Sequence, residues 1–533
     1  MSRPVFVAVT LVVVTLGVGS APAQDGGWAD LHAGGELDRY LRYLQSLGLV
    51  PAYPWGARAF SAVELERLAP PDTGHPWAGR YRFRGAASGE SVLSWVSPRA
   101  SIRINTAFPY GYNDGPLWQG RGVTLALDGG FAARVGVLSA SVAPSAFMAQ
   151  NAAFRVLSNG QSGDLAYGDG TLWYAIDRPQ RFGAGAYARL DPGQTMLRVD
   201  WRSVAIGVST ANQFWGPATE FPVILGNNAA GFPHLFVGTA RPVDLWLVKI
   251  HGRLLWGRLT QSAFAAETAS GGVRLGTGLV AVIVPRGLPG LELGVTRFSH
   301  RPWPGQLPSL AYLLNMFRGR QGPGEVNSPS ENQLASAFFR WVLPRSGFEV
   351  YAEYGRDDYN LDLRDFIEEP DHIGGYTLGF RKAVPRAGHR LLAVRAEMQN
   401  LQFSRLSQGR AWVPFYTHAG VQQGHTQLGQ VLGSEAGVGG AGSTVAVEAY
   451  SPSGRWTWSW TRLVRQHRGD FLFGGVEDPR ALDVQHALTV ERVAFRGRYD
   501  LWGRASLVYE FNRDFGSDAL NLHLAIGVRA GMP

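Results

Sequence analysis

Two segments of the chain concentrate the side chains that proteins use to bind sugars. The first, residues 111–122, reads GYNDGPLWQGRG, and the second runs from FWGP at 214–217 to NNAAGFPH at 227–234. Aromatic side chains stack on the flat apolar face of a sugar ring, while amides and guanidinium groups hydrogen-bond to its hydroxyls. Residue types alone favour the alternative of constrained loops whose amides satisfy their own backbone. The candidate ligand-binding residues are Trp118, Arg121, Trp215, Asn227, Asn228 and His234.

Motifs for a cofactor or an activated nucleophile are missing from the sequence. Gly437, Gly439 and Gly442 form a G-x-G-x-x-G, but TVAVE at 444–448 follows and indicates a strand, whereas a dinucleotide site requires a helix there. There is no H-E-x-x-H, no G-x-S-x-G and no phosphate-binding loop that contains a lysine. We therefore predict no catalytic residue and no cofactor.

Clustered carboxylates are the remaining candidates for chemistry. The acidic stretch at 357–371 could hold Ca²⁺, but it lacks the regular D-x-D-x-D-G spacing, and Arg356 and Arg364 offset its charge. We interpret it as a solvated loop and predict no metal. Glu349 and Glu353 share one face and could in principle hydrolyse a glycoside, although charges on a lumen face are routine in barrels.

The N-terminus has the features of a secretory signal peptide. Arg3 precedes an apolar run at 5–18, and the A-x-A pattern that ends at Ala23 marks a cleavage site, so we predict a signal peptide at 1–23. The alternative is a retained anchor helix, but the apolar run is shorter than the roughly 20 residues that span a bilayer. The absence of cysteine excludes a lipoprotein anchor, disulfides and cysteine-based metal sites.

Composition favours a membrane barrel over soluble domains or membrane helices. The 533 residues include 68 Gly and 17 Trp, and the mean hydropathy is −0.08. Beyond the signal peptide, no apolar run of 18 or more occurs, which argues against spanning helices. Alternating apolar and polar faces average to a neutral hydropathy, and aromatic girdles account for abundant tryptophan.

The basic side chains are almost all arginine. The formal net charge is +8, and Lys249 and Lys382 are the only lysines. Genomic base composition also favours arginine over lysine, so this bias has two open explanations. An exported barrel rarely meets nucleic acid, and we expect anionic lipopolysaccharide or acidic glycans as partners instead.

Residues 24–90 have the pattern of a small helical bundle. Leu37, Tyr40, Leu41, Leu44 and Leu47 fall on one helical face, and Gly48 ends that helix. A capping box at 61–64 begins a second helix, which the prolines at 70–71 stop. Because two short helices bury little surface alone, we expect them to pack on each other and against the end of the barrel.

From residue 91 to 533 the apolar pattern changes to a period of two. The runs at 348–354, 392–403, 456–461, 504–512 and 521–529 each alternate an apolar face with a polar face that carries charges and amides. In the run at 456–461 we predict that the three tryptophans face lipid and that Thr457, Ser459 and Thr461 face the lumen. About 440 residues at roughly 24 per strand and connection predict an antiparallel barrel of about 18 strands. The two sugar-type segments would then be binding segments or loops that cap or plug this barrel.

The same two segments resemble a known family. YNDGPLWQGRG at 112–122, FWGPATEFPVILGNNAAGFPH at 214–234 and TARPV at 239–243 are similar to the Wzi family of capsule assembly proteins. The N-terminal helical pair and the region at 370–380 share the resemblance, which covers nearly the whole mature chain. It implies an outer-membrane β-barrel lectin with a small periplasmic helical bundle at 24–90. Such a protein binds capsular polysaccharide and helps to attach and organise it at the cell surface. Many outer-membrane barrels end in an aromatic residue for the insertion machinery, whereas this chain ends in RAGMP.

Two alternative functions share the composition of a lectin barrel. The first is a porin or a transporter of polysaccharide or anions through an arginine-rich lumen. The second is a barrel enzyme that acts on lipid or glycan, which would require a serine–histidine or carboxylate pair facing inward with a perturbed pKa.

Overall fold

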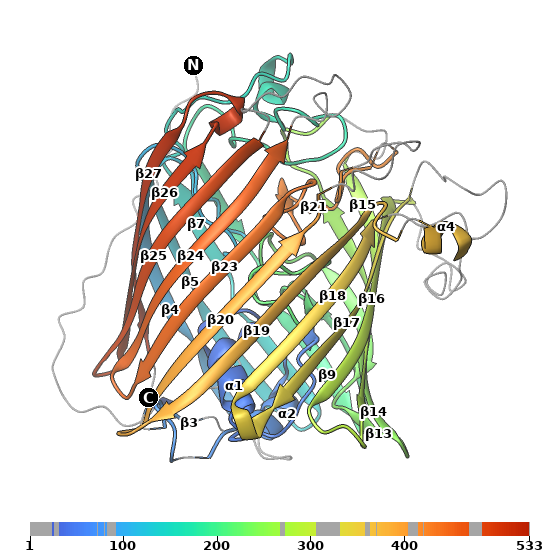
Figure 1. Cartoon of the computed structure of the whole chain (residues 1–533), viewed down its shortest axis with the longest axis vertical. Coiled ribbons are helices and arrows are strands. Elements are labelled where there is room, and N and C mark those ends of the chain that lie inside the picture. The colour runs from blue at the N-terminus through green and yellow to red at the C-terminus, as the bar shows by residue number, and fades with distance from the viewer. Residues whose placement is uncertain are drawn as a thin grey trace.

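The computed structural model describes most of the chain after the predicted signal peptide, residues 1–23, which lies outside the described residues. The described residues are 24–25, 31–71, 73–78, 80–82, 92–266, 272–304, 331–357, 363–368, 370–402, 414–418, 420–467 and 482–531. The acidic residues at 358–362 also lie outside them. Figure 1 shows a tall closed β-barrel with two helices near one end.

Neighbouring strands pair antiparallel around the whole barrel, and β27 pairs with β4 to close it. The first half contains β4 (Val92–Asn105), β5 (Gly122–Val135), β6 (Leu138–Val142), β7 (Ser145–Ala149), β8 (Tyr187–Asp191), β9 (Met196–Trp201), β10 (Val204–Ser209), β12 (His234–Thr239), β13 (Val243–Asp244), β14 (Val248–Thr260) and β15 (Val273–Pro285). The second half contains β16 (Leu291–Pro302), β17 (Asn332–Leu343), β18 (Phe348–Asp357), β19 (Gly374–Arg386), β20 (Arg390–Asn400), β23 (Ala441–Ser451), β24 (Gly454–His467), β25 (Leu482–Arg496), β26 (Tyr499–Phe511) and β27 (Ala519–Ala530).

In the described part of the chain, the 21 paired segments combine into 18 strands, as the sequence predicts, because three strands are interrupted. β6 and β7 both pair with β5, β8 and β9 lie opposite them, and β12 and β13 both pair with β14. Each interruption contains a proline: Pro144, Pro192 and Pro242. Proline has no backbone N–H to donate, so the ladder stops where it occurs.

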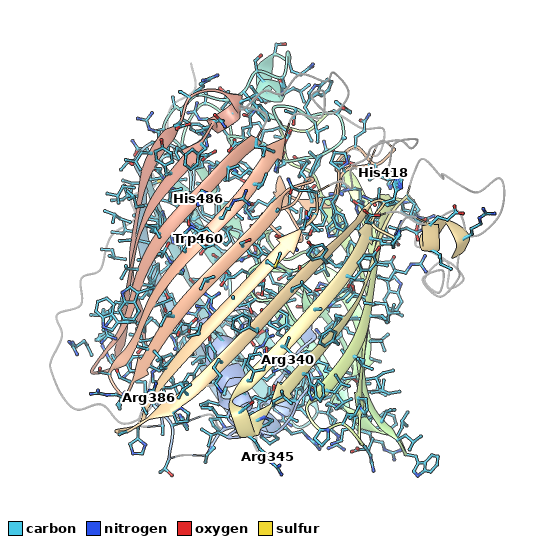
Figure 2. The ribbon with its side chains drawn as sticks, viewed as in Figure 1. Arg340, Arg345, Arg386, His418, Trp460 and His486 are labelled. Carbon is cyan, nitrogen blue, oxygen red and sulfur yellow. The ribbon has the colours of Figure 1, made fainter. Side chains whose placement is uncertain are left out.

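The two faces of the wall follow the predicted alternation. On β24, Trp456 and Trp458 are exposed at 42% and 44%, whereas Thr457 between them is 5% exposed. Trp460 lies on the same outer face, and its Nε1 donates to Nδ1 of His486 on the neighbouring strand at 3.2 Å (Figure 2). The predicted register of this strand is therefore confirmed.

The connections at the two ends of the barrel differ in length. The turn at η4 (Pro344–Ser346), which contains Arg345, and the turn after Arg386 are short and lie at the lower rim in Figure 2. The connections at the other end are long, such as 106–121 and 210–233, and the latter folds into the barrel. Outer-membrane barrels have short periplasmic turns and long extracellular loops, so the lower rim is the periplasmic end.

The predicted helices form, but they are enclosed by the wall. α1 (Glu36–Ser46) ends before Gly48, whose φ is +71°, and α2 (Ala62–Leu68) begins with the predicted capping box between Ser61 and Glu64. Their apolar side chains pack in one cluster with wall residues that include Ala393 and Tyr450. Both helices therefore lie inside the lower mouth of the barrel (Figure 1).

Enclosure also buries the polar face of α1, which the helical periodicity places in solvent. Asp38, Arg42 and Gln45 are each 2% exposed or less. The Nε of Arg42 donates to Glu349 Oε1 of β18 at 2.8 Å. The strand alternation predicts that Glu349 faces the lumen, and there it binds α1 rather than water.

The remaining elements are short and lie outside the 18 strands. Two-residue strands pair as β1 (Gln24–Asp25) with β3 (Tyr81–Arg82), β2 (Ala57–Arg58) with β11 (Phe214–Trp215), and β21 (Thr426–Gln427) with β22 (Gln430–Val431). The helical turns are η2 (Gly163–Tyr167), α4 (Leu363–Glu368) and η6 (Arg513–Phe515). No helix among the described residues has the length and apolarity needed to cross a membrane.

Candidate binding site at the outer mouth

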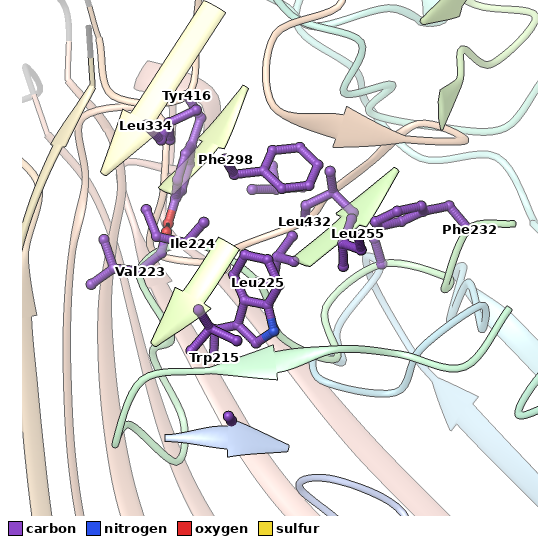
Figure 3. Close-up of a cluster of buried hydrophobic side chains, with 14 of the residues drawn as sticks. Trp215, Val223, Ile224, Leu225, Phe232, Leu255, Phe298, Leu334, Tyr416 and Leu432 are labelled. Atoms are coloured by element: carbon purple, nitrogen blue, oxygen red, sulfur yellow. Dashed lines mark hydrogen bonds between the residues drawn. The ribbon is translucent and has the colours of Figure 1, made fainter. Parts of the chain in front are cut away.

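The second sugar-type segment enters the barrel and forms a hydrophobic core there. We call residues 210–233 the inward loop. Trp215 is fully buried and packs edge-on against Phe298 of β16, with ring centroids 6.4 Å apart. Figure 3 shows Trp215, Leu225 and Phe232 of this loop facing Leu255 and Phe298 of the wall. This segment is therefore a plug within the lumen.

The inward loop meets the N-terminal segment in the middle of the barrel. β11 pairs antiparallel with β2, and Gly216 N donates to Gly56 O at 2.9 Å. Arg58 donates to Ala218 O at 2.8 Å, and Arg42 donates to Pro217 O at 2.6 Å. The segment 31–71 and the inward loop are therefore joined into one plug inside the barrel.

Wall carboxylates accept hydrogen bonds from the plug backbone. Glu397 of β20 accepts from Thr219 N at 2.7 Å, Glu220 N at 2.9 Å and Phe221 N at 2.6 Å. Glu292 of β16 accepts from Trp55 N at 2.9 Å in the same way. Buried backbone N–H groups need an acceptor, so these carboxylates satisfy groups that irregular plug segments would leave unpaired.

The candidate residues of the second segment are divided among different environments. Trp215 belongs to the plug core. His234 is 4% exposed at the start of β12, where its Nδ1 contacts Phe232 O at 2.7 Å. The Nδ2 of Asn227 donates to Ala33 O of the N-terminal segment. Asn228 is the member of this group that reaches a cavity at the outer mouth.

The first sugar-type segment forms a loop above the plug. Gly111 has a φ of +142°, and a Cβ there would lie 2.1 Å from the side-chain amide of Gln119. Trp118 is half-buried against Phe182, with ring centroids 4.9 Å apart. Arg121 donates to Thr106 O at 3.2 Å and to Ala153 O at 2.5 Å, so it holds neighbouring connections together.

A cavity of about 110 Å³, which we call the outer cavity, lies at the upper mouth. Of the six candidate residues, Trp118 and Asn228 line it, whereas Arg121, Trp215, Asn227 and His234 are not among its described lining residues. Asn228 donates from Nδ2 to Val431 O and to Glu435 Oε2, each at 3.2 Å. The charged lining residues outside the two sugar-type segments, which no sequence motif indicates, are Asp169, Arg178, Glu435, Arg465, Asp483, Arg513 and Asp514.

Those charged residues come from connections and strand ends that are far apart in the chain. None belongs to a recognisable motif, and closure of the barrel brings them together. Arg178 donates to Asp169 at 2.7 Å; burial opposes ionisation of Asp169, but Arg178 and two backbone N–H groups hold its pKa below the ordinary value. Burial raises the pKa of Asp514 even though Arg513 and Arg465 oppose that shift.

A second cavity of about 330 Å³ lies below the first, and we call it the lumen cavity. Its lining includes Glu36 of α1, Thr457 of β24 and Glu491 of β25. Tyr110, Gly111, Tyr112 and Asp114 line both cavities. The first sugar-type segment therefore separates the outer cavity from the interior of the barrel.

The other candidates for chemistry are enclosed or dispersed. Glu349 and Glu353 are 0% and 1% exposed; Glu349 is paired with Arg42 and Arg340, and Glu353 accepts from Ser336 Oγ at 2.6 Å. Within the described ranges, no group of three or more His, Asp or Glu side chains is placed to hold a metal ion. The glycine-rich run at 437–442 leads into β23, as the sequence predicts.

A closed antiparallel barrel with an apolar outer face and a polar lumen defines an outer-membrane-type β-barrel, here one whose lumen holds a plug. The chain belongs to the family of capsule assembly protein Wzi, whose family model matches residues 119–501. This confirms the family that the two segments resemble.

Comparison with solved structures supports the fold. Wzi of Escherichia coli, described as a carbohydrate-binding β-barrel involved in group 1 capsule assembly, superposes with a TM-score of 0.61 at 14% identity, over 96% of this chain and 100% of that one. A BenF-like porin of Pseudomonas fluorescens matches with a TM-score of 0.36 at 10% identity, over 83% and 99% of the two chains. OpdO of Pseudomonas aeruginosa gives 0.38 at 11% identity, over 81% and 96%. A search of curated protein sequences found no match.

Proposed function

We propose that this protein binds capsular or other surface polysaccharide at its outer mouth, without turnover, and helps to attach and organise it at the cell surface. The observation that carries the proposal is the plug, in which the inward loop is joined to the N-terminal segment, with the outer cavity above it. The Escherichia coli Wzi barrel that this chain resembles is a carbohydrate-binding protein, which supports the same ligand class.

The plug favours binding over the transport and enzyme alternatives. A transporter needs a continuous path, whereas the first sugar-type segment and α1 both border the lumen cavity. An enzyme that uses Glu349 would need substrate access, whereas that carboxylate is 0% exposed and paired with Arg42 and Arg340. The other proposed partners are membrane lipid and lipopolysaccharide, which would surround the apolar outer face, and the barrel insertion machinery.

Retention of the strain's own capsular polysaccharide by the purified protein tests the proposal. We expect Trp118→Ala to weaken binding several-fold, since losing one stacking aromatic costs about 1 kcal/mol. On cells the loss is larger, because a long polymer engages many copies and avidity multiplies small losses. Trp246→Ala is the matched control, since Trp246 is 86% exposed in a periplasmic turn.

The test has two outcomes that contradict the proposal. One is wild-type protein that fails to retain the polysaccharide. The other is a deletion strain whose capsule stays fully attached. Trp215→Ala is measured in the same assay. The Trp215 side chain packs in the plug core, so its loss would change binding indirectly, by altering the shape of the outer mouth.

A further inference from the structure

A groove of about 790 Å³ lies on the lipid-facing side of the barrel wall, and we call it the wall groove. Its lining includes Leu197 of β9, Val208 of β10 and Leu235 of β12, and each of these side chains is about half exposed. Their chain neighbours Arg198 and Phe236 point to the lumen and are buried. The wall groove therefore opens toward the membrane.

The floor of the wall groove is one row of side chains across five strands. Ala140 of β6 lies opposite Leu197, which lies opposite Val208. Val208 in turn lies opposite Leu235, and Leu235 lies opposite Trp256 of β14. Adjacent strands lie about 4.8 Å apart, so the row is roughly 19 Å long. Because Ala140 is near the periplasmic start of β6 and Trp256 is near the outer end of β14, the row runs from the outer rim down into the membrane.

The inward loop explains why the wall is hollow at this place. β10 and β12 are each only six residues long, because the chain between them leaves the wall and enters the lumen. Both ends of the inward loop stay bonded to the wall: Thr210 N donates to Thr195 O, and Arg258 N donates to Pro233 O, each at 2.9 Å. Beyond these bonds β10 and β12 supply no outward side chains, and that leaves a depression on the lipid side.

Arginines border the wall groove at its outer end. Arg258 of β14 is exposed and lines the groove. It lies opposite Leu275 of β15, and Arg301 of β16 lies opposite the same leucine from the other side. β14 and β15 contain no acidic residue, and Glu292 of β16 faces inward, where it accepts from Trp55 N at 2.9 Å. The lipid-facing side of these three strands is therefore basic at its outer end.

The adjoining residues keep this rim positive and mark it as a membrane interface. Arg297 of β16, on the same face, donates to Gln333 Oε1 of β17 at 2.6 Å. Glu331, just before β17, accepts from Gln333 Nε2 at 3.3 Å, so one acid stands against three arginines here. Trp256 and Trp303 line the groove beside them. Aromatic girdles of this kind lie where the apolar band of a barrel meets the polar headgroups.

We propose that the wall groove binds one lipopolysaccharide molecule, with its phosphates at Arg258 and Arg301 and an acyl chain along the row from Trp256 to Ala140. Arginine forms paired hydrogen bonds to phosphate, and burial of the chain against apolar side chains adds to them. The basic rim is at the extracellular end, where the outer leaflet supplies lipopolysaccharide. The inference goes beyond the lipid that surrounds any barrel, because it assigns one lipid to one site, and it does not depend on polysaccharide binding at the outer mouth.

Three lipid probes test this with the full-length protein, purified in detergent and freed of lipid. They are diphosphoryl lipid A, the same lipid A without its phosphates, and phosphatidylglycerol, an anionic glycerophospholipid. Native mass spectrometry counts the lipids bound to each protein molecule and gives the affinity of each probe. We expect one diphosphoryl lipid A to bind about ten-fold more tightly than either other probe, the scale of a hydrogen bond to a charged group.

Two variants separate the basic rim from the apolar floor. Arg258→Gln should weaken binding of diphosphoryl lipid A about ten-fold and leave the phosphate-free form unchanged. Ala140→Trp fills the floor and should weaken both forms several-fold. Arg462→Gln and Leu488→Trp are the matched controls, because both residues face lipid, on β24 and β25, and neither belongs to the described lining of the groove. Resistance to proteolysis shows that each variant is folded.

Equal affinity for the three probes, or many bound copies with no preferred one, would mean that the groove holds bulk lipid only, and overturns the inference. Tighter binding of phosphatidylglycerol overturns it in favour of a glycerophospholipid. Losses in Arg462→Gln or Leu488→Trp as large as those in Arg258→Gln or Ala140→Trp overturn the assignment to this groove. Retention of capsular polysaccharide is a separate measurement, so none of these results decides the proposed function.

Discussion

At the scale of single residues, lumen charges hold the plug. Glu349 of β18 lies within 2.8 Å of Arg340 of β17 and is also paired with Arg42 of α1. Glu397 accepts from three consecutive backbone N–H groups of the inward loop. Burying a charge is costly unless it is paired or hydrogen-bonded, and here Glu349 is ion-paired and Glu397 accepts several hydrogen bonds. The packing of the plug against the wall therefore depends on these wall carboxylates.

Glu349→Ala should destabilise the protein by about 3–5 kcal/mol, because it leaves two buried arginines without their main counter-charge. The free energy of unfolding in urea, measured in lipid vesicles, reports the change. Glu368→Ala removes the exposed partner of Arg364 and should cost about 0–1 kcal/mol. Equal effects of the two variants would contradict a structural role for Glu349.

Strand alternation places Glu349 and Glu353 on the lumen face from sequence alone, and the structure agrees. Their partners could not be predicted in this way. Arg42 is 307 positions from Glu349, and the pattern of either segment is local, whereas the contact depends on closure of the barrel. The same reason hides the outer cavity, since Asp169 and Asp483 belong to ordinary connections until the strands assemble.

At the scale of elements, the period of two identifies strands and the period of 3.6 identifies α1 and α2. Proline explains where the ladder breaks, as at Pro144 and Pro192. The sequence does not distinguish a loop outside the barrel from one inside it. The inward loop contains aromatic and amide side chains that suit a sugar site, but burial shows that Trp215 is a core residue.

Spin labels at positions 457 and 458 test the orientation of β24. The chain has no cysteine, so Thr457→Cys and Trp458→Cys each provide one labelling position. We expect the label at 458 to contact lipid, since Trp458 is 44% exposed on the outer face. Position 457 should report water, because Thr457 lines the lumen cavity. The same environment at both positions would show that the register is wrong.

Trp215→Ala tests the inward loop as a packed element. Truncating a fully buried tryptophan removes its contacts with the core and should cost about 3–5 kcal/mol. Amide hydrogen exchange should accelerate in β2 and β11, whose pairing depends on this loop. Trp246→Ala removes a tryptophan that is 86% exposed and should leave both strands protected. Unchanged exchange in Trp215→Ala would mean that the loop is held by the wall alone.

At the scale of the whole molecule, two segments obstruct the lumen of the barrel. The first sugar-type segment separates the outer cavity from the lumen cavity, and α1 with the rest of 31–71 fills the lower mouth. The composition does not show this, because a porin is consistent with the same composition features. The net positive charge of the chain also does not predict the charge of this cavity, since its described lining contains more acids than arginines.

Single-channel recording in planar bilayers tests whether two barriers in series close the barrel. Wild type should show almost no conductance, because Tyr110–Asp114 lies between the two cavities and α1 packs in the lower mouth. Replacing Tyr110 and Tyr112 by glycine joins the two cavities, but α1 still blocks the lower mouth, so conductance should stay low. Deleting 31–71 alone should also leave the upper barrier in place. The combined variant should conduct, since barriers in series must both be removed. A large steady conductance in wild type would instead favour transport through the barrel, and a large conductance in either single variant would show that one barrier closes it alone.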